Sequence, residues 1–503
     1  MNLVVLVLDT LRYDCVHHVG APGIAKVSTP HFDALRRDGV SFSAAYGEAE
    51  PTVPVRRALW TGLRSFPWRF DYDTKGLWPN ARGWHKIPPE QTTLSEVLLG
   101  QGYKTCLIGD VYHIFKSTQN FTRGFFNFDF VRGQETDNWK GGPLDLIREE
   151  AEKCVKGGLD PARHASLVQY LLNKRHFKEE AELTGGIVVQ RAMEWLKENH
   201  DDGPFMLWLE SFDPHEPWDP PRPYANRYYD FPVGKDGVEF IYPPEAARVG
   251  SDEEKERTKA LYYGEITYMD AMFGRLMNTL ADLGRLEDTV VMVTCDHGTE
   301  LLDHGRFGKS ADHLYAHNTQ LNWIVRQPNG RIASPSGRTI DAFVQNHDIV
   351  PTALDLLGLL DKWLGATLRQ AQGRLVDRPE WAGRSMKGLI EGKDGASGRE
   401  YVITGWGNMA SVRDREWNYV VRFEDPEGTE RLYDLRSDPL EQKDVASSHS
   451  DKVKEGRRRL EALTGQELGT KLPDGPLDDT VAPCRAYYGA PRPTRQEQAS
   501  GFV

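Results

Sequence analysis

The 503-residue chain lacks a long apolar run and lacks any excess of positive charge. A membrane-spanning helix needs about 20 consecutive apolar residues, and no segment approaches that length. Lys and Arg together number 62 against 74 for Asp and Glu, which gives a net charge of -12. Because a duplex-binding surface needs clustered positive charge, nucleic acid is a poor candidate for the partner. We therefore expect neither a membrane nor a nucleic acid among the partners.

Cysteine is also scarce. The five cysteines, at positions 15, 106, 154, 295 and 484, are scattered and never form a C-x-x-C pair, so neither a disulfide framework nor a thiolate zinc site is indicated. The apolar run from Leu3 to Leu8 is too short for a signal peptide and has no basic segment before it. These features predict a soluble, reduced, cytoplasmic protein and leave its oligomeric state open.

The pattern of apolar residues predicts an α/β fold. Continuous apolar runs of this length are typical of strands buried on both faces of a parallel sheet, and helical patterns over residues 183–198 and 253–283 lie between them. The predicted strands are Leu3 to Leu8, Lys104 to Ile108, Phe205 to Leu209 and Thr289 to Thr294. Alternating strands and helices indicate a large, mostly parallel central sheet flanked by helices.

The composition changes along the C-terminal part of the chain. We predict an α/β catalytic domain over residues 1–385, with a polar loop or insertion near residues 358–384. Short strand-like runs and one charged helical pattern predict a small α+β unit over residues 386–470, built on an antiparallel sheet. Residues 471–503 are rich in proline and are expected to form an extended tail.

Charged side chains follow two of the predicted strands. Asp9 comes directly after the first, and Asp296 and His297 come after the last. Ligands of open α/β sheets bind beyond the carboxyl ends of the strands, so these side chains can converge. Two carboxylates and an imidazole predict a divalent-metal site. The alternative is that both aspartates cap helices in strand-to-helix turns.

Thr52 stands just before a helical pattern that has Pro54 in its first turn. An ordinary helix cap would explain the threonine. Alternatively, Thr52 has a functional role, with its hydroxyl at the positive end of a helix dipole, where a metal and an anion can bind. Arg56, one turn on, could reach that anion with its forked donors.

Two further segments carry histidines. Asp213-Pro-His215 lies in a proline-rich loop after a predicted strand, and its histidine is either exposed or functional. The glycine- and histidine-rich segment from Asp296 to Lys309 extends to His313 and His317. Lys309 could pair with an anion, although a lone lysine is usually only solvated.

In this order the motifs resemble those of the sulfatases of the alkaline phosphatase superfamily, over roughly residues 2–465. Thr52 to Gly62 is similar to the signature Cys/Ser-x-Pro-Ser-Arg-x-x-Leu-x-Thr-Gly of that family. The other matching blocks are Asp9 to Arg12, Thr29-Pro-His-Phe-Asp-Ala-Leu35, Gly102 to Gly109, Asp213-Pro-His215, Asp296 to Lys309, His347 to Gly358 and Leu432 to Gln442. The resemblance implies an alkaline-phosphatase-like fold.

The resemblance also implies roles for individual residues. Asp9, Thr52, Asp296 and His297 would bind one divalent metal ion, which could be Ca, Mn, Mg or Zn. Thr52 would also be the nucleophile. Arg56, His215 and Lys309 would bind the anion, with His215 able to protonate the leaving oxygen. His113 and His317 would contact the substrate, although His113 lies one residue beyond the family histidine.

Three departures from the family pattern bear on the chemistry. Thr52 replaces the cysteine that sulfatases oxidise to formylglycine, so no formylglycine is expected, and a threonine ester must be broken by water. Thr10 replaces a family aspartate and Asp110 replaces a family lysine, so one carboxylate and one cation are lost. Relatives that bind two metals carry Asp-x-x-x-His, whereas this chain has Asp213-x-His215, so we expect one metal ion. The alternative is a second metal with His317 as a ligand.

Together these features predict a metal-dependent hydrolase of small anionic sulfate or phosphate esters. The family favours a sulfuric ester, whereas the threonine favours a phosphodiester, a phosphomonoester or a phosphonate. The alternatives are a transferase of a phosphoryl-type group and a catalytically silent protein that only binds an anion.

Overall fold

The computed structural model describes residues 1–17, 24–68, 83–117, 119–155, 157–177, 183–230, 251–328, 337–370 and 381–471. Its centre is an eight-stranded sheet with the order β11-β2-β10-β7-β1-β6-β4-β5. Every pairing is parallel except those of β10, which runs antiparallel to both of its neighbours. The strands are β1 (Asn2–Leu8), β2 (Val40–Tyr46), β4 (Lys104–Gly109), β5 (Asn127–Phe130), β6 (Phe205–Ser211), β7 (Thr289–Cys295), β10 (Trp323–Arg326) and β11 (Arg338–Gln345).

The four strands predicted from apolar runs are β7, β1, β6 and β4, which lie side by side in the middle of the sheet. All residues of β1, β6 and β7 are buried. Such strands have no polar face, which is why they appear in the sequence as unbroken apolar runs. The large, mostly parallel sheet is therefore confirmed.

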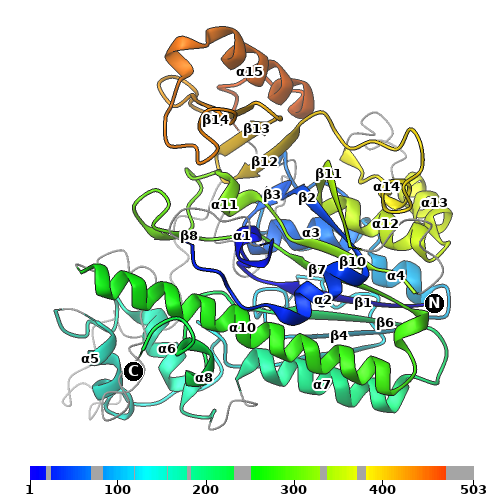
Figure 1. Cartoon of the computed structure of the whole chain (residues 1–503), viewed down its shortest axis with the longest axis vertical. Helices are drawn as coiled ribbons and strands as arrows, with labels where there is room; N and C mark the ends of the chain where they lie inside the picture. The colour runs from blue at the N-terminus through cyan, green and yellow to red at the C-terminus, as the bar shows by residue number, and fades with distance from the viewer. Residues whose placement is uncertain are drawn as a thin grey trace, which may run out of the picture.

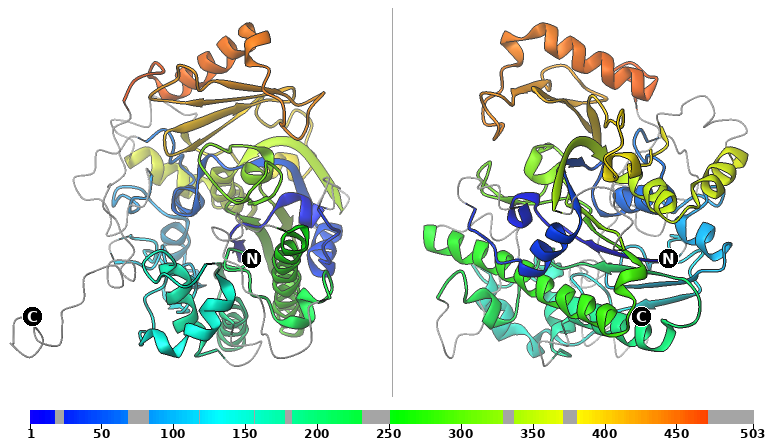
Figure 2. Two further views of the ribbon diagram at one scale, coloured as in Figure 1. Left: turned by 90° about the vertical axis from the view of Figure 1, so that its left-hand side faces the viewer. Right: turned by 45° about the vertical axis from the view of Figure 1, so that its right-hand side comes forward.

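Helices cover both faces of this sheet (Figures 1 and 2). The helices α2, α7 and α10 pack together, and α10 runs as one long helix across the molecule. The helices α3, α4 and α12 form a second group. The longer helices are α2 (Pro30–Asp38), α3 (Thr52–Thr61), α4 (Leu94–Leu99), α5 (Arg148–Cys154), α6 (Ala165–Lys174), α7 (Thr184–Asn199), α10 (Asp252–Asp282), α12 (Ile349–Leu356), α13 (Leu360–Gln370) and α15 (Ser450–Thr464).

A separate five-stranded sheet with the order β15-β14-β13-β12-β3 lies beyond the main sheet, with α15 packed on it (Figures 1 and 2). Its strands are β3 (Ala49–Glu50), β12 (Val402–Trp406), β13 (Met409–Arg413), β14 (Trp417–Arg422) and β15 (Arg431–Asp434). The C-terminal antiparallel sheet with one helix is thus present. The sequence did not reveal β3, which pairs in parallel with β12 and ties this sheet to the start of α3.

Residues 360–370, which we expected to belong to a loop or insertion, form α13. The apolar residues Leu360, Trp363, Leu364 and Leu368 recur at helical spacing, a pattern that the expectation of a loop overlooked. Trp363 is buried, and its indole N–H donates to the carbonyl of Thr61 at 3.1 Å. One buried indole holds the helix against the end of α3. Residues 371–380 and most of the expected tail, 472–503, lie outside the described residues.

The remaining elements are short. They are α1 (Tyr13–His17), α8 (Arg222–Ala225), α11 (Ala316–Thr319), α14 (Lys387–Ile390), β8 (Glu300–Leu301) and β9 (Phe307–Gly308). Four cysteines, at positions 15, 106, 154 and 295, are buried free thiols. Within the described ranges, no helix is both long enough and apolar enough to cross a lipid bilayer.

Candidate active site

The predicted metal ligands meet at the carboxyl edge of the main sheet. The strands β1 and β7 are parallel neighbours with Leu8 opposite Cys295, so Asp9 and Asp296 emerge side by side. Asp9, Asp296 and His297 each offer a ligand atom, and these atoms lie within 4.8 Å of one another. All three residues are fully buried. The sheet register therefore builds the cluster that the sequence predicted from two strand ends.

Several atoms of this cluster have no hydrogen-bond partner among the described residues, namely both carboxylate oxygens of Asp9 and Nε2 of His297. Helix capping does not account for Asp9, because α1 begins only at Tyr13. Asp296 Oδ1 does accept from the backbone N–H groups of Thr10 and His297, at 3.0 and 2.8 Å. Asp9 thus keeps its acceptors available for another group.

The charges in the cluster shift its titration. Burial and the neighbouring Asp296 raise the pKa of Asp9 well above its usual value. Burial acts to raise the pKa of Asp296 as well, but His297 and Arg56 outweigh it and hold that pKa low. Burial lowers the pKa of His297 to about 4, so its ring is neutral at neutral pH and can donate a lone pair.

Thr52 is the first residue of α3, and Pro51 occupies the capping position before it. The alternative of an ordinary threonine cap is therefore wrong. The side chain of Thr52 is almost fully buried, and its hydroxyl forms no hydrogen bond with the described residues. A hydroxyl at a helix N-terminus without a structural partner is free to serve as a ligand or a nucleophile.

Arg56 joins the threonine to the carboxylates. Its Nη1 lies 3.1 Å from the carbonyl oxygen of Thr52, 2.6 Å from Asp296 Oδ2 and 3.2 Å from Asp9 Oδ2. Its Nε donates to Glu210 Oε2 at 2.7 Å. Nη2 is buried and has no partner among the described residues, so it is the donor that remains available for an anion.

The donor set fits a divalent cation. It combines buried carboxylate oxygens without partners, a neutral imidazole nitrogen and a hydroxyl at the start of α3, which is a mixed oxygen and nitrogen set. An isolated buried carboxylate is costly unless it is paired with a cation or a metal. Arg56 supplies only one positive charge to Asp9 and Asp296, and it also serves Glu210.

His215 and Lys309 come together from distant parts of the chain. The Lys309 amine lies 2.9 Å from His215 Nε2 and 3.1 Å from Glu216 Oε1. Burial and Lys309 lower the pKa of His215 although Glu216 opposes them. The resulting cation-and-imidazole pair is suited to hold an anion and pass a proton.

His113 lies near this pair. Its ring and that of His215 both contact Phe212, with ring centroids 6.1 and 4.1 Å from it. Burial lowers the pKa of His113 well below its usual value, with smaller contributions from Lys116, His215 and other cations. The tentative alignment of His113 with the family histidine stays a prediction, but its location agrees with a role close to the substrate.

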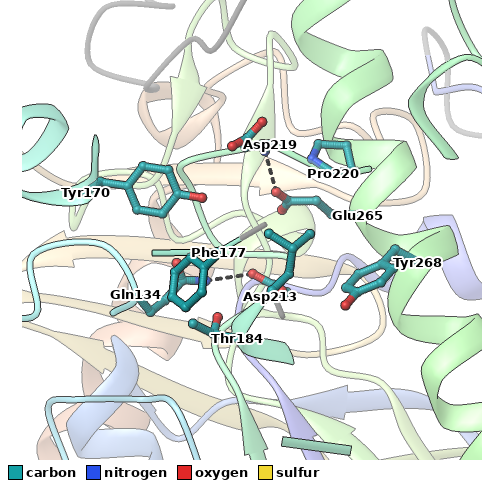
Figure 3. Close-up of a pocket in the computed structure, with 10 residues that line it drawn as sticks. Gln134, Tyr170, Phe177, Thr184, Asp213, Asp219, Pro220, Glu265 and Tyr268 are labelled. Carbon is teal, nitrogen blue, oxygen red and sulfur yellow. Dashed lines mark hydrogen bonds between the residues drawn. The ribbon is translucent and has the colours of Figure 1, made fainter. Parts of the chain in front are cut away.

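Asp213 lines a small cavity of about 10 Å³, and His215 is not among the lining residues (Figure 3). Its carboxylate accepts from Gln134 Nε2 at 2.6 Å, and Glu265 lies across the cavity. The volume suits a single water molecule. His215 and Asp213 thus belong to different surroundings, and His317, the candidate extra ligand, groups with Glu300 and His304 instead.

Three acidic residues at this site were not predicted from the sequence: Glu50, Glu210 and Glu216. Both oxygens of Glu50 are buried without a partner among the described residues, and its pKa is raised well above normal by burial and by Asp296, with Lys309 opposing. Its position two residues before Thr52 was the available signal. Glu210 ends a buried strand, and Glu216 follows His215 directly.

Comparison with known proteins agrees with this geometry. A family model described as Sulfatase matches residues 1–359. The chain is 24% identical over 504 residues to an arylsulfatase of Clostridium perfringens, covering 93% of this chain and 95% of that protein. It is 25% identical over 420 residues to the multifunctional alkaline phosphatase superfamily protein PehA of Trinickia caryophylli, covering 74% and 76%.

The fold likeness extends over almost the whole chain. The crystal structure of the phosphonate monoester hydrolase of Agrobacterium radiobacter matches with a TM-score of 0.65 at 22% identity, covering 95% of this chain and 97% of that one. The alkaline-phosphatase-like fold is confirmed. From the extent of the family match we conclude that the chain belongs to the sulfatase family and is a hydrolase that acts on ester bonds.

Proposed function

We propose that this protein is a metal-dependent hydrolase of small sulfate, phosphate or phosphonate esters, with Thr52 as its nucleophile. One observation carries the proposal. A single nitrogen, Nη1 of Arg56, contacts the backbone carbonyl of Thr52 and the carboxylates of Asp9 and Asp296, so the first turn of α3, which carries the Thr52 hydroxyl, lies beside the predicted metal ligands.

Asp9, Asp296, His297 and the Thr52 hydroxyl would hold the ion. A divalent cation there acts as a Lewis acid, which favours the ionised hydroxyl and neutralises charge on the transferring group.

In the first half of the reaction, the oxygen of Thr52 forms a bond to sulfur or phosphorus. The ester bond to the leaving oxygen breaks, and that oxygen takes a proton from the His215–Lys309 pair, in which the Lys309 ammonium beside Nε2 can supply the proton that His215 passes on. Lys309 lies against His215, and Nη2 of Arg56 has no hydrogen-bond partner among the described residues, so both can bind the oxygens on which charge develops. The products are an alcohol and a threonine ester.

In the second half, water attacks the sulfur or phosphorus of that ester, the bond from that atom to the Thr52 oxygen breaks, and the Thr52 hydroxyl is restored with a proton. Water is required because threonine has no second hydroxyl to expel the group. We assign the proton acceptor to Glu50. Glu50 is fully buried, and neither of its carboxylate oxygens has a hydrogen-bond partner among the described residues. Its pKa is affected by the charges of both Asp296 and Lys309. It is not among the residues grouped with Asp9. A carboxylate near the metal that is not a ligand is suited to remove a proton from water.

Phosphorus esters are the better match to this nucleophile, and sulfuric esters are the better match to the family. The single oxygen of Thr52 cannot release sulfate by collapse to an aldehyde, as formylglycine does. The two most informative relatives point in different directions, since one is called an arylsulfatase and the other a phosphonate monoester hydrolase.

The test is a rate panel with p-nitrophenyl sulfate, p-nitrophenyl phosphate, bis-p-nitrophenyl phosphate and p-nitrophenyl phenylphosphonate, each with and without added Mn²⁺, Zn²⁺, Mg²⁺ or Ca²⁺. Thr52→Ala is the nucleophile variant, and Thr61→Ala, at the other end of the same helix, is the matched control. We expect metal-dependent turnover that Thr52→Ala abolishes and Thr61→Ala retains.

Turnover by Thr52→Ala at the normal rate would refute the nucleophile assignment. Transfer of the group to an added alcohol in place of water would favour the transferase alternative. Binding of inorganic sulfate or phosphate without turnover of any ester would favour the silent, anion-binding alternative.

A further inference from the structure

A second cluster of metal-ligating side chains lies apart from the site described above. Glu300 on β8, His304 in the turn between β8 and β9, and His317 on α11 each offer a ligand atom, and these atoms lie within 4.8 Å of one another. None of these residues has a role in the proposed reaction. Although the chain segments are close in sequence, only the fold of the β8–β9 hairpin against α11 brings the three together.

Each of the three residues has a buried atom without a hydrogen-bond partner in the described part of the chain. These atoms are Oε2 of Glu300, Nδ1 of His304 and Nε2 of His317. The side chain of Glu300 is fully buried, and no hydrogen bond links it to either histidine. Arg306 Nε lies 3.4 Å from Oε1, so Glu300 already has a cation on that oxygen. Its other oxygen, Oε2, is buried beside two imidazoles without a hydrogen bond among the described residues, which is costly unless a further partner binds there.

The outer contacts of the cluster prepare these atoms for a metal. Nε2 of His304 lies 3.1 Å from the carbonyl oxygen of Glu441, which can only accept, and 3.3 Å from Nε2 of Gln442, which can only donate. The shorter contact favours the ring proton on Nε2, which leaves the lone pair on Nδ1. The other oxygen of Glu300, Oε1, is bound by Nδ1 of His313. Metal-ligating histidines and carboxylates usually carry outer contacts of this kind, which fix their orientation.

We propose that Glu300, His304 and His317 form a second metal site, which binds a divalent transition metal of the zinc class. Two imidazoles and one carboxylate are a common donor set for zinc, with a fourth position left to water. The site is separate from the Asp9 cluster and does not depend on the proposed reaction.

Such an ion would act as a clamp. The hairpin β8–β9 lies between His297 and Lys309, and β9 ends directly before Lys309. His304 also contacts Glu441, which belongs to the C-terminal unit. The ion would therefore restrain the chain segment between His297 and Lys309. It would hold this segment against α11 through His317 and against the C-terminal unit through His304.

The test counts zinc ions on the full-length protein. The metal-free protein is dialysed against Zn²⁺, and bound zinc is measured by mass spectrometry of the metal. The variants are Glu300→Gln, His317→Asn and Asp296→Asn, with the exposed His176→Asn as the matched control. Circular dichroism shows that each variant is folded. Co²⁺ binding to Asp296→Asn gives an absorption band from the second site alone, so the result does not depend on variants of that site.

We expect two zinc ions in the wild type and in His176→Asn, and one fewer in Glu300→Gln and in His317→Asn. Asp296→Asn should keep the ion of the second site and show the Co²⁺ band. The proposal is overturned if Glu300→Gln and His317→Asn bind as much zinc as the wild type, or if Asp296→Asn binds no metal. One ion that is kept by Asp296→Asn and lost by His317→Asn would support this site and count against the catalytic metal.

Discussion

Asp110 occupies the position at which the family pattern has a lysine. Its buried environment leads us to predict that its carboxyl group is uncharged at neutral pH. The residue is fully buried, and its carboxylate accepts from the backbone N–H of Phe212 at 2.6 Å. Burial and the neighbouring Asp213 raise the pKa of Asp110 to about 8, and burial raises that of Asp213 to about 7. At neutral pH, Asp110 is therefore mostly a neutral acid, so the lost lysine is not replaced by a full negative charge.

The consequence for stability follows from proton linkage. An unfolded aspartate is ionised above pH 4, whereas folded Asp110 stays protonated up to about pH 8. In this range the folded state binds more protons than the unfolded state, so stability falls as the pH rises. Each pH unit costs about 1.4 kcal/mol, and the change from pH 5.5 to pH 7.5 therefore costs roughly 2–3 kcal/mol.

Asp110→Asn removes this dependence, because an amide keeps the acceptor for Phe212 and does not titrate. We expect the variant to gain stability relative to the wild type by roughly 2–3 kcal/mol between pH 5.5 and pH 7.5. Urea denaturation at the two pH values, with the exposed Asp394→Asn as control, measures the difference. If Asp110→Asn and the wild type lose stability in parallel, Asp110 is already ionised and the reasoning is wrong.

Two further predictions concern the proposed reaction, and a third concerns packing. Lys309→Met should lower kcat/KM by about 10²–10³. It should also raise the pKa of His215 in the pH–rate profile, because Lys309 lowers that pKa in the wild type, and an unshifted profile would contradict the contact. Glu50→Gln should slow kcat by about 10²–10⁴ and let the ester on Thr52 accumulate, seen as a mass increase of the protein, whereas loss of rate without that ester would place Glu50 in the first step. Gly298→Ala should cost at least about 1–3 kcal/mol in thermal denaturation, because an added Cβ would lie 2.0 Å from a backbone oxygen of α11, and an unchanged Tm would show that α11 can move.

The centre of the fold could be predicted from the sequence because the strands there are buried on both faces. The four predicted strands became β7, β1, β6 and β4. Exposure does not explain every strand that was missed, because β2 and β10 are almost wholly buried; β2 consists largely of serine and alanine, and β10 has only four residues. The edge strand β5 has two exposed and two half-buried residues, so its composition is close to that of a loop. The two-residue strand β3 is too short to leave any pattern, yet it joins the two sheets.

Site residues could be predicted from the sequence where an ionisable side chain directly follows an apolar strand. Asp9 and Asp296 follow apolar strands, and the parallel register then places them together. Glu50 and Glu210 could not be found in this way. Glu210 lies within β6, where a carboxylate is unexpected, and only the folded structure shows that it pairs with Arg56 at 2.7 Å. Long-range pairing of this kind leaves no local signal in a single sequence.

The balance of charge at the site argues for a divalent ion independently of the family. Two fixed cations, Arg56 and Lys309, face a larger set of buried carboxylates. These carboxylates are Asp9, Glu50, Glu210, Glu216 and Asp296. Arg56 pairs with Glu210 and Lys309 with Glu216, so the remaining acids have no full countercharge of their own.

The acids without a full countercharge are those whose titration is most disturbed. Burial, with Asp296 adding to it, raises the pKa of both Asp9 and Glu50 well above normal, so without a cation these groups hold protons. A divalent ion bound by Asp9 and Asp296 would replace the proton of Asp9, because ligands must be deprotonated to bind, and its positive charge would favour the ionised form of Glu50 nearby. The ion would also convert a site that repels anions into one that accepts an anionic ester.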